Sequence, residues 1–211
     1  GVALGAVLVT PVSAQQRVSI YTAHTANIVE RLIPEFEKAT GIKADVVKAG
    51  SGDIINRVRA ESANPKGDVI WSIGAELLEA NTDLLEAYQP KEHAMIADAF
   101  KTTGPWLPYT GILNVFVVNT KKLKPEEYPK TWMDLAQPRF KNLVSMADAE
   151  KSGSAYMQLN TFLTIYGDKP AGWDKFKEVF KNLNVSGSSG AVPRFVNDGE
   201  AAVGLSNEDI V

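Results

Sequence analysis

The stretch Arg17–Glu76 reads RVSIYTAHTANIVERLIPEFEKATGIKADVVKAGSGDIINRVRAESANPKGDVIWSIGAE and decides the fold. It passes three times from an apolar strand through a turn of small polar residues into the start of a helix. The strands are predicted over residues 18–21, 42–47 and 68–71, and the turns over residues 22–25, 49–53 and 72–76. Consecutive βα units predict a parallel sheet whose turns open at one edge, where crevices and helix N-termini bind small ligands.

The N-terminal residues indicate the compartment. Gly1–Val12 is apolar and too short to span a bilayer, and it ends in Val12-Ser13-Ala14, which fits the small-x-small rule for signal-peptide cleavage. We expect a signal-peptide remnant over residues 1–14 that lacks its Met and basic start, in a protein exported to the periplasm, or outside the cell in a Gram-positive organism. A buried N-terminal strand is the alternative. The absence of Cys agrees with export without disulfides.

The composition is that of a soluble globular protein, with 211 residues, 45% hydrophobic residues and a formal net charge of −3. Lys and acidic residues are interspersed, so there is no basic patch of the kind that nucleic acid or an anionic membrane surface requires. After the N-terminal segment, no apolar run approaches the roughly 20 residues that cross a bilayer.

The organisation changes near Pro105. Residues 77–100 form a predicted helical stretch, and residues 112–118 form a long, largely buried strand. The strand–turn–helix pattern then restarts at residues 143–166 and ends in a strand at residues 201–205. We therefore expect a first α/β lobe over 17–105, a hinge with a crossing strand over 106–119, a second α/β lobe over 120–211, and a cleft between the lobes.

Six blocks carry a family resemblance. In their order along the chain they are similar to the extracellular, or periplasmic, solute-binding proteins of ABC importers, family 1, in the branch that holds ferric-iron, 2-aminoethylphosphonate and phosphorylated-sugar binders. The resemblance runs from Arg17 to Val211 and is specific for the family, not for the ligand. The blocks are Ile20–Thr25, Ile33–Ile42, Gly67–Trp71, Thr131–Leu135, Ser152–Tyr156 and Asp198–Gly204.

The resemblance implies a periplasmic-binding-protein type II fold, with two α/β lobes joined by crossing strands that close on a ligand by hinge bending. It also implies a chain that is truncated at both ends and incomplete at the C-terminus, where family members return to the first lobe. The implied partners are a small anionic ligand and the ABC permease in the membrane, with no cofactor, no nucleic acid and a monomer at full length. The ligand would be carried for import without chemical change, so no enzyme is expected.

An organophosphate or a phosphonate fits the polar turns best. Phosphate oxygens accept hydrogen bonds from several donors at short distance, and hydroxyls and the N–H groups at helix N-termini supply such donors. Carboxylates beside them accept from sugar hydroxyls or pair with an ammonium group. Each Ser or Thr is also explained as a simple helix cap, and Trp71 and Tyr109 are also explained as core aromatics. A ligand site is therefore favoured only because several of these polar residues are expected to meet in one place. The predicted ligand contacts are Thr22, His24, Thr25, Ser51, Gly52, Trp71, Ser152, Gly153, Ser154, Ser188, Ser189, Glu208 and Asp209.

Two alternatives stay open. In the ferric branch, adjacent tyrosines after the strand matching residues 201–205, together with a histidine in the first turn, hold iron. By resemblance those tyrosine positions fall at Glu208 and Asp209, and His24 lies one position early, so a ferric site would use these three residues. The second alternative is a hydrolase with a Ser51–His24 pair. No GxSxG, HExxH or Cys nucleophile supports an enzyme.

Overall fold

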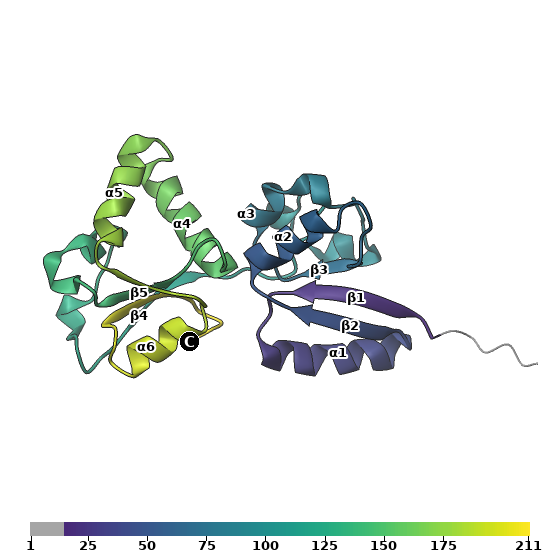
Figure 1. Ribbon diagram of the computed structural model, residues 1–211, viewed down its shortest axis with the longest axis horizontal. Helices are drawn as coiled ribbons and strands as arrows, with labels where there is room; N and C mark the ends of the chain where they lie inside the picture. Colours follow the sequence, from purple (N-terminus) through teal and green to yellow (C-terminus); the bar gives the residue numbers. More distant parts are fainter. Residues whose placement is uncertain (1–14) are drawn as a thin grey trace, which may run out of the picture.

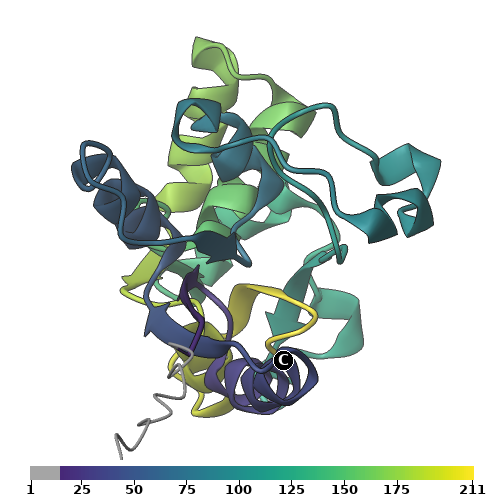
Figure 2. The ribbon, with the colours of Figure 1, turned by 90° about the vertical axis from the view of Figure 1, so that its right-hand side faces the viewer.

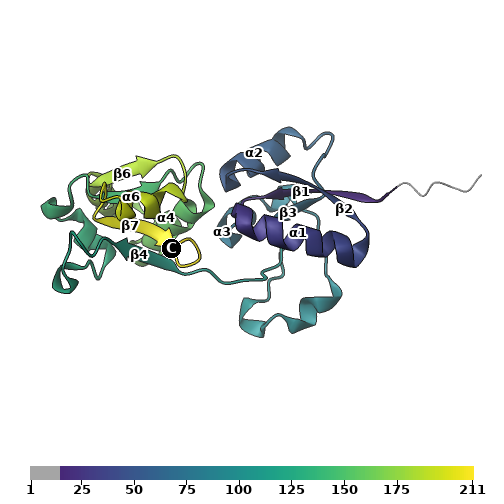
Figure 3. The same ribbon diagram turned by 90° about the horizontal axis from the view of Figure 1, so that it is seen from below.

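The structure, a computed structural model, describes residues 15–211. The predicted signal-peptide remnant at residues 1–14 lies outside the described residues. Two α/β lobes lie side by side, the first built from the N-terminal half of the chain and the second from the C-terminal half (Figure 1). An extended segment that leads into the second lobe connects them, as the view from below shows (Figure 3).

The first lobe consists of the predicted βα units. Its sheet has the order β2-β1-β3 with all strands parallel, and Ile20 pairs with both Val46 and Val69. The helix α1 lies on one face of this sheet, and α2 and α3 lie on the other (Figure 1). The sequence prediction of three strand–turn–helix units is confirmed. In chain order the elements are β1 Arg17–Thr22, α1 Ala26–Thr40, β2 Lys43–Lys48, α2 Ser51–Ala60, β3 Val69–Trp71 and α3 Ala75–Glu79.

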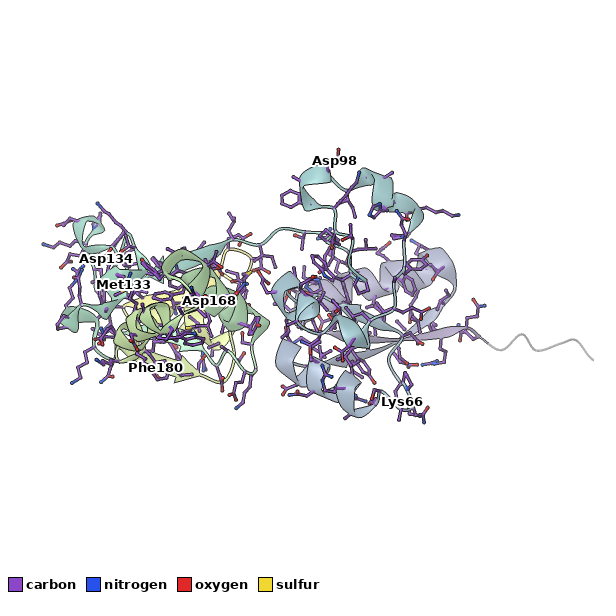
Figure 4. All side chains as sticks on the ribbon, turned by 90° about the horizontal axis from the view of Figure 1, so that it is seen from above. Lys66, Asp98, Met133, Asp134, Asp168 and Phe180 are labelled. Carbon is purple, nitrogen blue, oxygen red and sulfur yellow. The ribbon has the colours of Figure 1, made fainter. Side chains whose placement is uncertain are left out.

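The prediction of a helical stretch over residues 77–100 is wrong. The helix α3 ends at Glu79, and short 3-10 helices follow at Thr82–Leu84, Lys91–Met95 and Asp98–Phe100. The amide of Asn81 donates to the Leu77 carbonyl at 2.9 Å and accepts from Arg59 at 2.8 Å, which closes the helix end. The last of the short helices projects to one side of the lobe (Figure 2), and Asp98 marks its outer margin (Figure 4).

The second lobe has a sheet of order β4-β7-β5-β6, in which β5 pairs in parallel with β6 and β7, and β4 runs antiparallel to β7. The strand part of the predicted crossing segment is therefore an edge strand of this sheet. The elements are β4 Asn114–Val118, β5 Val144–Ala147, α4 Gly153–Tyr166, α5 Pro170–Phe180, β6 Leu183–Ser186, α6 Ala191–Asn197 and β7 Val203–Asn207, with 3-10 helices at Pro125–Glu127, Trp132–Ala136 and Pro138–Phe140.

The main hydrophobic core lies in the second lobe. Phe162 of α4 is fully buried, and the rings of Trp132 and Phe176 pack edge-on against it at centroid distances of 5.9 and 5.3 Å. On the other face of the sheet, Gly204 lets α6 approach β7, because a Cβ there would lie 2.8 Å from methyl groups of Val192 and Val196. Within residues 15–211 no helix combines the length and apolar character that crossing a membrane demands.

Candidate ligand-binding cleft

Two turns rich in small residues meet where the lobes touch. We call them the facing turns: Gly50–Gly52 leads into α2 of the first lobe, and Glu150–Ser154 leads into α4 of the second. A Cβ added to Gly52 would lie 2.0 Å from the Glu150 carbonyl oxygen, and one added to Gly153 would lie 2.4 Å from the Ser51 hydroxyl oxygen. Gly52 therefore faces the backbone of the second lobe and Gly153 faces the Ser51 side chain, and neither position has room for a side chain unless its neighbour moves.

The facing turns bring together five of the predicted ligand contacts. Ser51 and Gly52 open α2, and Ser152, Gly153 and Ser154 surround the start of α4. Ser51 is 4% exposed, in keeping with its place in the contact between the lobes. The N-termini of two helices and the hydroxyls of these serines thus lie in one region, and helix N-termini with hydroxyls beside them favour an anion.

The serines of the second facing turn have different partners. The Ser152 hydroxyl accepts from the Ala155 backbone N–H at 3.3 Å, so Ser152 caps α4. The Ser154 hydroxyl accepts from the Asn207 side-chain amide at 3.0 Å, which leaves its own hydrogen to donate elsewhere. Asn207 is 3% exposed, and its Oδ1 has no hydrogen-bond partner within residues 15–211. Sequence reasoning missed Asn207, although it directly precedes the predicted contacts Glu208 and Asp209.

A second group of polar side chains, which includes His24 and Tyr109, lies near the end of β3. The Tyr109 hydroxyl is 2.5 Å from the His24 Nε2, and the Trp71 ring lies edge-on to His24 at a centroid distance of 4.5 Å. Ser72 follows with a φ of 66°, a left-handed conformation that is uncommon for a residue with a side chain and that recurs at functional sites. Tyr109 belongs to the segment between the lobes, whereas the sequence favours a core aromatic at this position over a cleft residue.

The charge state of this group follows from its surroundings. Burial lowers the pKa of His24 below its ordinary value, and the nearby Asp209 carboxylate acts in the opposite direction. Burial also raises the pKa of Tyr109, mainly by penalising its phenolate. A neutral imidazole beside a protonated phenol is a hydrogen-bonding pair rather than a charged one, and Asp209 is close enough to interact electrostatically with it.

The other predicted contacts have local structural roles in their own turns. Thr22 is fully buried, and its hydroxyl accepts from the His24 backbone N–H at 3.1 Å, so it shapes the first turn. Thr25 occupies the N-cap position of α1 without a side-chain capping bond. The Glu208 carboxylate accepts from the Leu113 backbone N–H at 2.5 Å. Ser188 and Ser189 precede α6, where the Ser188 carbonyl accepts from the Ser186 hydroxyl at 2.8 Å.

The metal and hydrolase alternatives find limited geometric support. In the part of the chain that the structure describes, no three His, Cys, Asp or Glu side chains are grouped to hold a metal ion. Across the same residues no hydrogen bond joins Ser51 to His24, whose Nε2 is occupied by Tyr109. Both alternatives remain predictions from the sequence.

A cavity of about 500 Å³ adjoins the facing turns. It lies between α2 and α3 of the first lobe and α4 of the second, which face one another across the lobes (Figure 1). Both lobes therefore contribute to its wall. The lining residues are Gly52, Ile55, Asn56, Leu77, Asn81, Ala149, Glu150, Ser152, Gly153, Tyr156 and Leu159.

Comparison with known proteins connects this geometry to a family. The family model described as bacterial extracellular solute-binding protein matches residues 64–206. An uncharacterized protein of Haemophilus influenzae is 34% identical over 206 residues, covering 92% of this chain and 59% of the relative. The Fe(3+)-binding periplasmic protein of Serratia marcescens is 27% identical and covers 92% of this chain and 57% of the relative.

Two further comparisons concern phosphorus compounds. The putative 2-aminoethylphosphonate-binding periplasmic protein of Salmonella typhimurium is 28% identical, covering 80% of this chain and 49% of the relative. The solved structure of the periplasmic binding protein AfuA from Actinobacillus pleuropneumoniae, with exogenous fructose-6-phosphate bound, superposes with a TM-score of 0.82 at 28% identity, covering 92% of this chain and 64% of that chain. The chain thus spans between about half and two thirds of the length of these proteins.

Proposed function

Because this chain belongs to the bacterial extracellular solute-binding proteins, we propose that it captures a small anionic ligand, an organophosphate or a phosphonate, between its lobes for an ABC importer. The observation that carries the proposal is the meeting of the facing turns. There α2 and α4 present their N-termini and the hydroxyls of Ser51 and Ser154 to one region. The importer's permease, a periplasmic location and a monomeric state belong to the same proposal.

The chemistry of the facing turns suits a phosphate or phosphonate group. The first backbone N–H groups of a helix have no acceptor within the helix, and the helix dipole favours negative charge beside them. Hydroxyl donors add hydrogen bonds without a full opposite charge, which permits reversible holding. Since the hydroxyl of Ser154 already accepts from Asn207, its hydrogen is available to an anion.

His24, Tyr109 and the two carboxylates after β7 offer further polar contacts to the ligand. Glu208 and Asp209 follow β7 directly and are exposed, so their carboxylates accept from ligand hydroxyls or pair with an ammonium group. Tyr109 and His24 add neutral donors and acceptors. The names of the Salmonella relative and the Actinobacillus structure support a phosphorus compound of this kind.

The proposed mechanism is capture by hinge closure without chemical change of the ligand. Residues 101–113 contain no helix or strand and connect the two lobes, so rotation there would open and close the facing turns. A ligand that contacts both turns favours the closed arrangement, because it gains contacts with the second lobe in that arrangement alone. The closed protein would then present surfaces of both lobes to a membrane permease.

Ferric iron is the second candidate ligand. The Asp209 carboxylate acts electrostatically on the pKa of His24, which supports a site that uses both residues, and the name of the Serratia relative adds to this case. The Glu208 carboxylate, however, accepts from a backbone N–H, and phenolates are missing from the matching positions. A phosphorus compound is therefore the preferred proposal.

Isothermal titration of the protein with ferric citrate, 2-aminoethylphosphonate and a hexose phosphate tests the proposal. We expect saturable binding of a phosphorus compound that weakens in Ser154→Ala. The matched control is Ser62→Ala, which removes an exposed hydroxyl in the turn after α2. Binding of ferric citrate alone would reject the proposal in favour of iron, and consumption of a phosphate ester during the titration would indicate an enzyme instead.

A further inference from the structure

We propose that the cavity between α2, α3 and α4 receives an organic part of the ligand that carries no negative charge, while the phosphate or phosphonate of the ligand lies at the facing turns. The inference rests on the function proposed above and names the ligand class more closely. The ligand would be an organic phosphate or phosphonate with a sizeable body free of negative charge, rather than inorganic phosphate, a short aminoalkyl phosphonate or a metal ion.

The size of the cavity is the first argument. Its volume of about 500 Å³ falls within the range of roughly 300–1,000 Å³ that is usual for small-molecule sites. A single ion or a phosphate group would fill a small part of that space and leave the remainder to water. A volume of this size, bounded by both lobes, matches a ligand that carries a ring or a chain of several carbon atoms.

The lining is predominantly apolar on its helical sides. Ile55 from α2, Leu77 from α3 and Leu159 from α4 come from three different elements and border the same space. A ligand that covers these side chains removes apolar surface from water, which favours binding. The body of the ligand is therefore expected to have at least one apolar face.

The charge on the wall restricts the body further. Among the described residues that line the cavity, Glu150 alone carries a charge, and that charge is negative. A second anionic group in the cavity would be repelled by Glu150 and would find no cation on the wall. The negative charge of the ligand thus belongs at the facing turns, and the part in the cavity carries no negative charge.

Two polar groups on the wall are available to orient this body. Within residues 15–211 neither the Asn56 amide nor the Tyr156 hydroxyl makes a side-chain hydrogen bond, and both residues line the cavity. Asn81 is different, because its amide bonds to both Leu77 and Arg59 and forms a fixed part of the wall. Asn56 and Tyr156 would thus select a body with one or more hydroxyl groups.

The cavity and the facing turns share residues. Gly52, Ser152 and Gly153 belong to the facing turns and also line the cavity. A phosphorus group at the two helix N-termini would therefore have a covalently attached body directly beside this space. The two parts act as one site with an anionic end and an amphipathic end.

Filling the cavity tests the inference. Asn56→Trp places a large side chain at an exposed position of α2 that lines the cavity. Ala60→Trp is the matched control, because Ala60 is also exposed on α2, one turn further on, but does not line the cavity. Each variant is titrated with inorganic phosphate, phenyl phosphate and a hexose phosphate. We expect Asn56→Trp to weaken binding of both esters by about tenfold or more and to leave inorganic phosphate within about twofold, while Ala60→Trp matches the parent protein.

A second variant tests the polar wall. Tyr156→Phe keeps the ring and removes the hydroxyl, so it should weaken the hexose phosphate by several-fold and leave phenyl phosphate unchanged. The inference would be overturned, while the proposed function stands, if Asn56→Trp bound both esters as tightly as the parent protein does. The same holds if the parent protein bound inorganic phosphate as tightly as the esters. Failure of every phosphorus compound to bind the parent protein would reject the proposed function itself.

Discussion

Asn207, the last residue of β7, holds the hydroxyl of Ser154, in the first turn of α4, through a hydrogen bond of 3.0 Å. Because the Asn207 amide donates, the serine hydrogen is free to point away from the sheet toward an anion. Asn207→Ala should weaken binding of a phosphorus ligand by several-fold, in line with a net hydrogen-bond contribution of about 0.5–1.5 kcal/mol. Titration of Asn207→Ala, Ser154→Ala and the double variant measures the coupling between them.

Asn114→Ala serves as the control for this pair. Asn114 pairs with Asn207 across the strands, and its amide donates to Thr161, further along α4, at 2.8 Å. Removal of the Asn114 amide disturbs the contact between the sheet and α4 but leaves the hydrogen bond to Ser154 in place. Equal losses of affinity in Asn114→Ala and Asn207→Ala would mean that packing of α4, and not the position of the Ser154 hydroxyl, controls binding.

The facing turns predict that Gly52 controls closure of the lobes. A Cβ at this position would lie 2.0 Å from the Glu150 carbonyl oxygen, a backbone atom that cannot move alone. Gly52→Val should keep the lobes apart and weaken ligand binding by at least about tenfold, while each lobe stays folded. Small-angle X-ray scattering with ligand present would report a larger radius of gyration than in the parent protein.

Gly187→Ala is the matched substitution, because nothing lies within 4 Å of a Cβ added there. It should leave both the scattering curve and the thermal unfolding unchanged. If Gly52→Val closes to the same radius as the parent protein, the contact between the facing turns is not what limits the approach of the lobes.

His24 makes the stability depend on pH. Burial lowers the pKa of His24 in the folded state below the value of about 6.5 that it has when unfolded. Between these two values the unfolded chain binds more protons, so the free energy of unfolding falls as the pH is lowered through this window. His24→Asn should flatten that part of the profile. Urea unfolding at a series of pH values measures it, and an unchanged slope in the variant would assign the dependence to other groups.

The core of the second lobe should depend strongly on Phe162. This fully buried ring packs against Trp132 and Phe176, so Phe162→Ala leaves a large cavity and should destabilise the lobe by about 3–5 kcal/mol. Ile165→Ala, on the same helix but 57% exposed, should cost less than about 1 kcal/mol. Urea unfolding followed by tryptophan fluorescence compares them, and similar midpoints would contradict this description of the core.

Much of the fold was accessible from the sequence, because alternation of apolar strands, small-residue turns and helix starts is a local signal. The helix predicted over residues 77–100 is interrupted in two ways. Pro90 is a local helix breaker that the prediction overlooked, and the end of α3 is held by Arg59, which is distant in sequence and bonds to Asn81 and Asp83. Tertiary contacts of this kind have no local pattern.

The candidate site was accessible in part. Small residues at the ends of strands pointed to the facing turns, since parallel strands bring their carboxyl ends to one edge. The roles of Tyr109 and Asn207 depend on where other elements place them: Tyr109 meets His24 from the connecting segment, and Asn207 meets Ser154 from a neighbouring strand. Such pairings become visible when the lobes are assembled in space.

The antiparallel pairing of β4 with β7 bears on whether the second lobe can fold by itself. Asn114 begins the first strand of the second sheet and Asn207 ends the last one, and the two residues are direct cross-strand partners. Within the described residues, the two ends of this sheet's chain segment therefore lie side by side, with the main apolar core formed between them. We expect residues 114–207, with their two ends joined by a short linker, to keep the native pairing of β4 with β7.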